Sequence, residues 1–220
     1  DESIIGIHDY SLARIDSAGT PTMGMMFGTT EFDVPEKMIT TDDGYVMCGF
    51  TLYAGYFNPM IIKSSKSYGK NWSQIISAPF KDMLCSDISE AADGSGYVIT
   101  GNVVTLMGGP DSIFVMKLDT AGTLLWSNFY GIDSMDNFKA RGIATDPNGR
   151  GYLVCGYYKH SPRYSQPYIL KTDLDEKARL DLVQLASVAQ LTQRKWENVL
   201  LTLSTTQPAR GTSAPSLGTL

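Results

Sequence analysis

The chain has 220 residues, of which 43% are hydrophobic and 19% are charged, and its formal net charge is −5 at pH 7. This length allows a substantial core and one or two domains. The acidic balance argues against nucleic-acid binding, which requires a basic face. No apolar stretch approaches the roughly 20 residues of a membrane-spanning helix, so we expect no membrane span.

In chain order, the first repeated element is an apolar strand that ends in a basic residue. The basic positions, which are 49, 54 and 54 residues apart, are Arg14, Lys63, Lys117 and Lys171. A turn glycine follows the first three, and two of these turns lead into strands that begin at Trp72 and Trp126. The sequence therefore predicts a recurring pair of strands joined by a glycine turn.

A second strand motif occurs three times at nearly even spacing. It consists of Gly-Tyr, three further residues and Gly, and it starts at Gly44, Gly96 and Gly151, which are 52 and 55 residues apart. Each copy follows a further strand and a tight turn rich in Asp, Asn and Gly, residues that tolerate the positive φ of hairpins. Four short strands per unit of about 50 residues indicate a propeller blade, with the Gly-Tyr strand on its outer edge.

The unit from Phe114 to Gly156 resembles the β-propeller repeats of many secreted bacterial, archaeal and protist proteins. Their pattern runs roughly Asp-x-x-Leu-x-Lys-Leu-Asp, Gly, Trp, Tyr-Gly and then Asp-Gly-Gly-Tyr-x-x-x-Gly. The resemblance covers about residues 8–176. It implies an all-β propeller and an extracellular or cell-surface location, but it carries no catalytic residues.

We expect a four-bladed β-propeller over residues 1–204, with blades at about 8–52, 56–106, 110–160 and 165–204. Residues 197–203 would form the third strand of the last blade, whose Gly-Tyr strand is missing. Residues 2–7 would supply it as a closing strand, with Gly6 in the place of Gly49. Such closure hides strand edges. The alternative is that the chain is a fragment of a larger propeller.

The C-terminal segment 180–217 departs from the repeat and resembles part of the mucoidy-inhibitor-like, β-rich bacterial proteins of unknown function. The matching residues are Val188, Gln190, Thr192, Trp196, Val199, Leu201, Leu203, Ser204, Thr205 and Pro208. Gln193-Arg194-Lys195 departs from that family's Gly-Glu-Asp. Alternation of Val199, Leu201 and Leu203 predicts a strand that either completes this domain or docks into a neighbouring subunit.

We predict no catalytic residues, no metal site and no cofactor. The two histidines, His8 and His160, hold non-equivalent repeat positions, whereas a metal centre or a Ser-His-Asp triad needs histidine with organised partners. The cysteines Cys48, Cys85 and Cys155 are expected to be buried free thiols.

The basic positions Arg14, Lys63, Lys117 and Lys171 form the most regular chemical feature of the repeats. If their strands line a central channel, the four cations would converge and hold an anion. If they face solvent, they would pair with nearby carboxylates. The recurring aromatic residues are expected to pack between blades rather than to form a sugar platform; they are Trp72, Trp126, Tyr45, Tyr97 and Tyr152.

Two parts of the chain are candidates for glycosylation. Asn71 begins the sequon Asn71-Trp72-Ser73, on an expected turn. Residues 205–220 form a Ser/Thr/Pro-rich tail whose composition suits O-glycosylation or a flexible linker. The candidate acceptors in this tail are Thr205, Thr206, Thr212 and Ser213.

A repeat scaffold without catalytic residues favours a non-enzymatic, extracellular structural, assembly or adhesion protein. Its terminal strands would polymerise it into a filament or surface layer, so its partners would be further copies of itself, or cell-surface glycans and proteins. The alternative is a lectin-like, carbohydrate-binding propeller or the remnant of a glycoside-active enzyme. Recurring tryptophan makes a quinoprotein a distant third hypothesis.

Overall fold

The computed structural model describes residues 8–78, 81–105, 109–131, 137–161, 164–172 and 181–183. Contacts divide the chain into two compact units, 1–185 and 186–220, and all described residues belong to the first. This described part is all-β, which confirms that part of the predicted fold class. Among these residues, no helix is long and apolar enough to cross a membrane.

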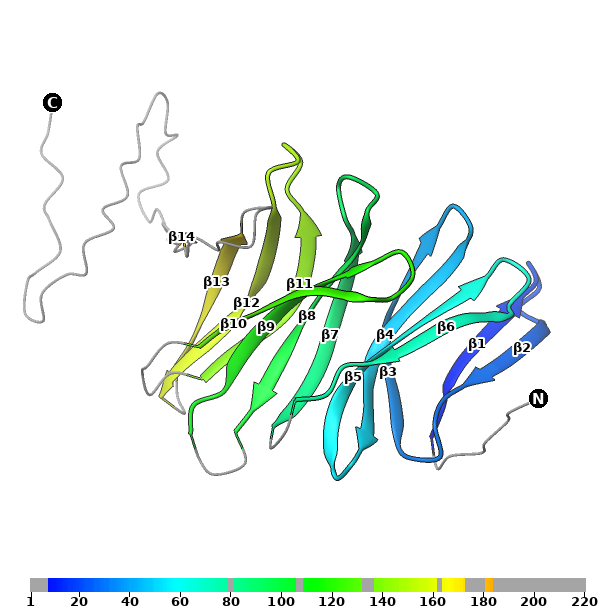
Figure 1. Ribbon diagram of the computed structural model, residues 1–220, viewed down its shortest axis with the longest axis horizontal. Helices are drawn as coiled ribbons and strands as arrows, with labels where there is room; N and C mark the ends of the chain where they lie inside the picture. The colour runs from blue at the N-terminus through cyan, green and yellow to red at the C-terminus, as the bar shows by residue number, and fades with distance from the viewer. Residues whose placement is uncertain are drawn as a thin grey trace, which may run out of the picture. The chain divides into compact units, whose positions relative to one another are not determined.

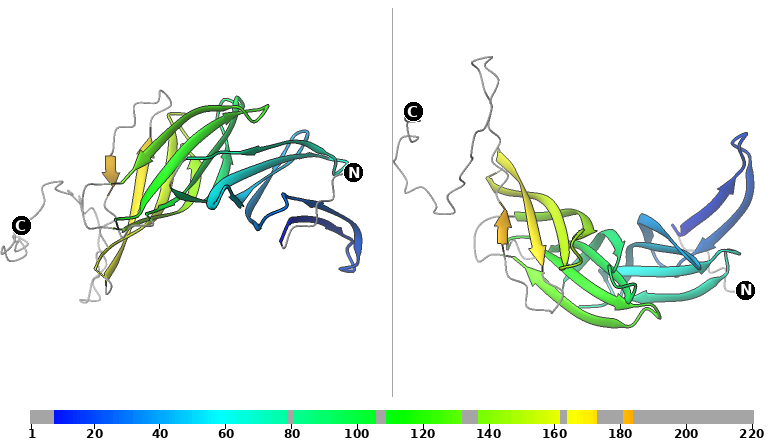
Figure 2. Two further views of the ribbon diagram at one scale, coloured as in Figure 1. Left: turned by 60° about the horizontal axis from the view of Figure 1, so that its bottom comes forward. Right: turned by 90° about the horizontal axis from the view of Figure 1, so that it is seen from above.

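The strands form one hairpin and three four-stranded antiparallel sheets, which follow one another in chain order (Figures 1 and 2). The hairpin consists of β1 (Tyr10–Ile15) and β2 (Pro21–Phe27). Sheet I consists of β3 (Asp33–Thr41), β4 (Gly44–Tyr53), β5 (Tyr56–Ser65) and β6 (Lys70–Ile75). Sheet II consists of β7 (Asp82–Glu90), β8 (Gly96–Val104), β9 (Ser112–Asp119) and β10 (Leu124–Tyr130). Sheet III consists of β11 (Asn137–Thr145), β12 (Tyr152–Ser161), β13 (Tyr164–Thr172) and β14 (Asp181–Val183).

The sheets begin at a different point of the repeat than the sequence predicted. The expected blades ended after each Gly-Tyr strand, near residues 52, 106 and 160. Instead β4 pairs directly with β5 across the tight turn at Ala54 and Gly55, both with positive φ, and Tyr53 lies opposite Tyr56. The Gly-Tyr strand is therefore the second strand of its sheet and not an outer strand. The break falls after the fourth strand, where the chain passes to the next sheet.

The expected last blade, 165–204, is affected in the same way, because β13 and β14 complete the sheet of β11 and β12. The expected closing strand, 2–7, and residues 184–204 lie outside the described residues. Within the described ranges, the strands form separate small sheets rather than a closed barrel.

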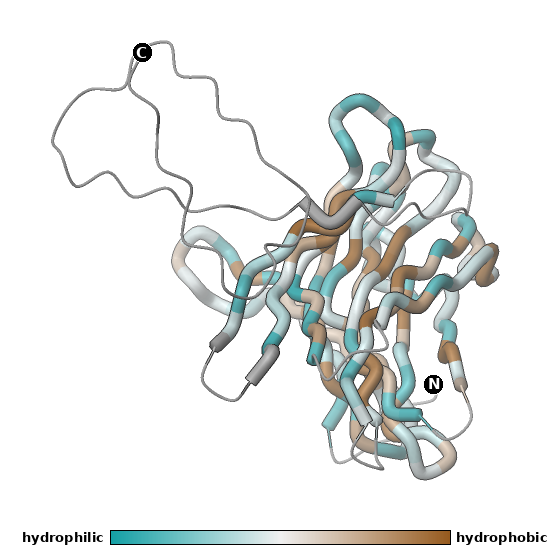
Figure 3. The backbone as a smooth tube through the Cα atoms, turned by 90° about the vertical axis from the view of Figure 1, so that its left-hand side faces the viewer, coloured by the Kyte–Doolittle hydropathy of each residue, from teal (hydrophilic) through white to brown (hydrophobic). Residues whose placement is uncertain are grey.

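Hydrophobic clusters lie between successive sheets and join them. One cluster combines Val46 and Ile61 of sheet I with Ile99 and Met116 of sheet II, all at most 1% exposed. Another joins sheets II and III, and a third joins the β1–β2 hairpin to sheet I. In Figure 3 the hydrophobic colour follows the strands, and the hydrophilic colour gathers at hairpin ends. Each fully buried aliphatic side chain contributes about 1.5–3 kcal/mol, so the sheets are held together chiefly through their faces.

The same aromatic contact recurs between successive sheets. The rings of Trp72 in sheet I and Tyr97 in sheet II lie 6.2 Å apart at 48°, and those of Trp126 and Tyr152 lie 6.3 Å apart at the same angle. The Trp72 indole also donates a 3.1 Å hydrogen bond to the carbonyl of Thr120. These contacts confirm the predicted packing role of the four residues. Tyr45 instead stacks on Tyr68, with ring centroids 5.7 Å apart.

A β-bulge occupies the same place in every complete sheet, opposite the second glycine of the Gly-Tyr motif. In sheet I, Pro35 pairs with Gly49 and Lys37 with Cys48, so Glu36 is the extra residue. The equivalent extra residues are Ser86 in sheet II and Arg141 in sheet III. A Cβ at Gly49 would lie 1.9 Å from the carbonyl oxygen of Val34, which explains why the motif ends in glycine. Bulges of this kind redirect a side chain out of the ladder.

Candidate functional site

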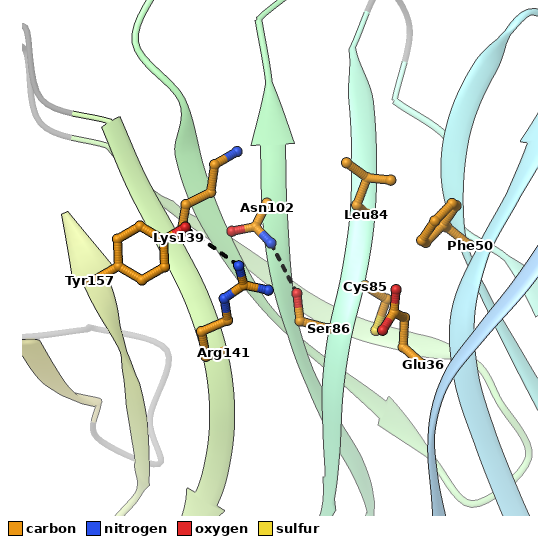
Figure 4. Close-up of a pocket in the computed structure, with 9 residues that line it drawn as sticks. All are labelled: Glu36, Phe50, Leu84, Cys85, Ser86, Asn102, Lys139, Arg141 and Tyr157. Carbon is orange, nitrogen blue, oxygen red and sulfur yellow. Dashed lines mark hydrogen bonds between the residues drawn. The ribbon is translucent and has the colours of Figure 1, made fainter. Parts of the chain in front are cut away.

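A cavity of about 400 Å³ lies where the first two strands of sheets I, II and III meet (Figure 4). Its size falls within the range of small-molecule sites. The residues that line it are Glu36, Phe50, Leu84, Cys85, Ser86, Asn102, Lys139, Arg141 and Tyr157. In Figure 4 the side chains from β11 and β12 lie on one side, those from β3 and β4 on the other, and Ser86 and Asn102 between them.

Most of the residues that line the cavity occupy corresponding positions in the three sheets. The three bulge residues, Glu36, Ser86 and Arg141, all contribute to it. Phe50, Asn102 and Tyr157 also contribute, and each of them directly follows the last glycine of its Gly-Tyr motif. The repeat therefore presents two side chains per sheet to one cavity, and their chemistry differs from sheet to sheet.

Asn102 and Asp87 link sheet II to sheet III beside the cavity. The buried Asn102 amide accepts a 2.8 Å hydrogen bond from the backbone N–H of Ala140 and donates one of 2.9 Å to the Ser86 hydroxyl. The Asp87 carboxylate accepts a 2.9 Å hydrogen bond from the N–H of Ile143. It also lies 3.9 Å from the ammonium group of Lys37 in sheet I. These bonds fix the relative positions of β3, β7 and β11, which carry the bulge residues.

Cationic groups gather on the sheet III side of the cavity. The Arg141 guanidinium donates a 3.4 Å hydrogen bond to the Tyr157 hydroxyl and lies 5.5 Å from the centre of its ring. This hydrogen bond, together with the nearby charges of Arg141 and Lys159, lowers the pKa of Tyr157 below its usual value of 10.0. Lys139 forms a 2.8 Å ion pair with Asp111, so its charge is compensated.

On the opposite side, the exposed Glu36 carboxylate has neither a hydrogen bond nor an ion pair to another described residue. Among the described residues, an anion without a partner and a cation hydrogen-bonded to a phenol thus belong to the same cavity. The arrangement suits a polar ligand that offers both an acceptor and a donor.

Residues 155–220 match the model of a family described as a domain of unknown function, DUF4139. The match covers less than half of the chain. It begins within β12, takes in β13 and β14, and includes the segment that departs from the repeat. Among curated proteins, no match was found.

Each lysine of the basic repeat positions has a carboxylate partner within its own sheet. Lys63 lies 2.7 Å from Asp43, Lys117 lies 3.6 Å from Asp93, and Lys171 lies 2.7 Å from Asp146. Each aspartate belongs to the turn before the Gly-Tyr strand. Hydrogen bonds from the lysines are the main reason why the pKa values of Asp43 and Asp146 are lowered.

Arg14 is exposed on β1 and forms no salt bridge to another described residue. None of the four basic positions lines the cavity, because the three lysines lie on third strands and Arg14 lies on β1, whereas the cavity is formed by the first and second strands of sheets I, II and III. The pairing expected of surface lysines therefore occurs, although Lys63 and Lys117 are buried between the sheets.

The cysteines follow the prediction in part. Cys48 and Cys85 are buried free thiols, and a hydrogen bond with Cys85, together with burial, raises the pKa of Cys48. Cys155 is exposed, contrary to expectation. Its counterpart Cys48 is covered by sheet II, whereas the described part of the chain has no sheet beyond sheet III.

Asn71 lies on β6 rather than on a turn, and its side chain is exposed. The other predicted positions lie outside the described residues; they are Val199, Leu201, Leu203, Thr205, Thr206, Thr212 and Ser213. Within the described ranges, no group of three or more His, Cys, Asp or Glu residues is placed to hold a metal ion.

The sequence reasoning missed the cavity. The bulge positions hold Glu, Ser and Arg, so no residue type repeats there to attract attention. A signal was present in the sequence, because the second glycine of the Gly-Tyr motif always lies at the same distance from the first. This glycine marks the close approach of two backbones opposite each bulge.

Proposed function

We propose that this protein is a non-enzymatic structural protein of extracellular surfaces, built as a four-bladed propeller, that assembles when strands are added to its β1–β2 hairpin. The observation that carries the proposal is that this hairpin reproduces the third and fourth strands of a complete sheet. It thus provides an edge to which the first two strands of another sheet can be added.

The equivalence extends to the turn between the two strands. In the hairpin, the Asp16 carboxylate accepts hydrogen bonds of 2.9 Å from the N–H groups of Ala18 and Thr20. In sheet II, the Asp119 carboxylate accepts bonds of 2.9 and 2.8 Å from Ala121 and Thr123. In the sequence, Arg14 of β1 stands as many residues before Asp16 as Lys117 of β9 stands before Asp119.

In every complete sheet, the third strand pairs with a Gly-Tyr strand, but β1 pairs only with β2 among the described strands. An unpaired edge presents N–H and C=O groups that template strand addition. The expected strands at residues 2–7 and 197–203 have the patterns that would fill the second and first places of this sheet.

Exposed methionines on β2 offer a second surface for contact between copies, in addition to the strand edge. Met23, Met25 and Met26 are 39%, 37% and 64% exposed, on both faces of the strand. A strand added to the free edge of β1 would leave these side chains in water. Flexible thioether side chains of this kind suit an interface with another molecule.

The test is to delete residues 199–220 and measure oligomeric mass by light scattering. We expect a folded monomer, whereas the full chain forms larger assemblies because it retains the donated strand. Deletion of residues 206–220 alone is the matched control and should leave assembly intact. An unchanged oligomeric mass after the longer deletion would contradict the proposal.

Carbohydrate binding is the second candidate function, and the composition of the cavity supports it. The aromatic rings of Phe50 and Tyr157, the Ser86 hydroxyl and the Glu36 carboxylate are the groups with which proteins contact sugar rings and their hydroxyls. Glu36 is the sole carboxylate among the described lining residues, whereas glycoside hydrolysis commonly uses a pair. The cavity therefore favours binding over hydrolysis.

A further inference from the structure

We propose that the cavity between sheets I, II and III binds a carboxylated saccharide, with the uronate group on Arg141 and the hydroxyl groups on Ser86 and Glu36. The inference rests on the carbohydrate-binding function proposed above and adds the charge and orientation of the ligand. It is independent of assembly through the β1–β2 hairpin.

Arg141 is the group that selects the carboxylate. It is the bulge residue of β11, so its backbone lies outside the regular strand pairing and its side chain reaches the cavity. Its guanidinium has five N–H donors, and in the described structure the side chain makes one hydrogen bond, to Tyr157. The remaining donors can bind both oxygens of a carboxylate in the fork geometry that arginine favours.

The neighbouring charges reinforce this choice of ligand. Lys159 lies 5.8 Å from the centre of the Tyr157 ring, and the Arg141 guanidinium lies 5.5 Å from the same ring. The Asp111 carboxylate on this side is engaged by Lys139 at 2.8 Å. A ligand carboxylate therefore meets a net positive side of the cavity.

The middle and the opposite side of the cavity provide partners for hydroxyl groups. Ser86 already accepts a hydrogen bond from Asn102, so its own O–H is free to donate to a ligand oxygen. Glu36 can accept from one or two hydroxyls, because no described residue occupies its oxygens. The Tyr157 ring lies next to Arg141, across the cavity from Glu36 (Figure 4), and offers a face for packing against the sugar ring.

Geometry also favours a ligand larger than a simple carboxylate. The cation and the uncompensated anion come from sheet III and sheet I, with Ser86 of sheet II between them (Figure 4). A saccharide that carries its carboxylate at one end and hydroxyls along the ring matches this order of partners. The links of Asn102 and Asp87 between the sheets hold the partners in place before the ligand arrives, which lowers the entropic cost of binding.

The experiment is calorimetric titration of the full chain with digalacturonic acid and, separately, with its methyl ester, which keeps the rings but removes the charge. We expect the acid to bind at least about tenfold more tightly than the ester, and the difference to shrink as salt is added. Arg141→Gln should abolish the preference, and Glu36→Gln should weaken both ligands. Tyr157→Phe should retain the preference, because the arginine remains.

Arg150→Gln is the matched control, since Arg150 is exposed on the β11–β12 turn and lies outside the cavity lining. It should bind both ligands as the unchanged chain does. Equal binding of acid and ester would overturn the assigned charge but leave carbohydrate binding standing. Absence of binding by both ligands would overturn the inference together with the carbohydrate-binding function.

Discussion

The Nζ atom of Lys63 lies 2.7 Å from the Oδ2 atom of Asp43, although the lysine side chain is 8% exposed and that of the aspartate is 61% exposed. The ammonium group is also 5.7 Å from the ring centre of Tyr97 in the next sheet. A turn residue at the surface thereby neutralises a cation buried between two sheets. A lysine and a turn aspartate also pair in sheet II, again with the lysine as the more buried partner, and in sheet III, where the aspartate is the buried one.

We predict that Asp43→Asn lowers the free energy of unfolding by about 1 kcal/mol, because it leaves the Lys63 ammonium with a weaker, neutral partner. Solvent around Asp43 screens the pair and keeps the effect modest. Urea denaturation at pH 7 measures it. The exposed neighbour Asp42 supplies the control, since Asp42→Asn removes the same charge without touching Lys63. Equal losses in the two variants would show that the pair has no specific role.

The same pair has a pH dependence with a defined sign. The pKa of Asp43 is lowered below 3.8, chiefly by the hydrogen bond from Lys63. Its stabilising contribution is therefore fully present above the ordinary carboxyl pKa and is lost as the pH falls through the lower native value. Between pH 5 and pH 2, the free energy of unfolding of Asp43→Asn should accordingly fall less than that of the unchanged chain. Denaturation followed by circular dichroism at each pH measures the difference.

We predict that Gly101→Ala destabilises the fold by about 1–3 kcal/mol or more. A Cβ at this position would lie 2.1 Å from the carbonyl oxygen of Leu84 and 2.6 Å from the Phe114 ring, so the backbone around the bulge must shift. Gly24→Ala on β2 is the matched control, because nothing lies within 4 Å of its added Cβ. Thermal unfolding compares the two. If Gly101→Ala unfolded at the same temperature as Gly24→Ala, the close contact between the strand backbones at the bulge would be contradicted.

Thiol chemistry tests the burial of the three cysteines. The native protein should react rapidly with Ellman's reagent at Cys155 and slowly at Cys48 and Cys85, which are at most 1% exposed. The raised pKa of Cys48 further lowers its thiolate fraction. We expect one fast thiol per chain, none in Cys155→Ser, and three after unfolding in guanidinium. Three fast thiols in the native protein would contradict the packing of sheets I and II.

Much of the fold could be predicted because strand repeats leave a pattern in the sequence. The Gly-Tyr motif, the lysine strand and the tryptophan strand each become strands where predicted. The strand at which each sheet begins could not be derived in the same way. Both sides of Ala54-Gly55 are strands joined by a turn, and sequence alone does not distinguish a hairpin within one sheet from a connection between two.

The cavity was beyond sequence reasoning for a different reason. Glu36, Ser86 and Arg141 belong together only because each is the unpaired residue of a bulge, and a bulge is a feature of pairing between strands. The lysines were conspicuous in the sequence because they recur. Their regularity reflects one structural task repeated in each sheet, which is pairing with the turn aspartate.

The bulges separate two roles within one repeat. Residues of the ladder must satisfy the neighbouring strands and the packed faces, so a change there alters stability. The bulge residue has no cross-strand partner, and a replacement there alters the cavity while the register on either side is maintained by glycine and its flanking pairs. Three positions, one in each sheet, can thus be exchanged independently to prepare a family of variants that share a scaffold and differ in the ligand they select.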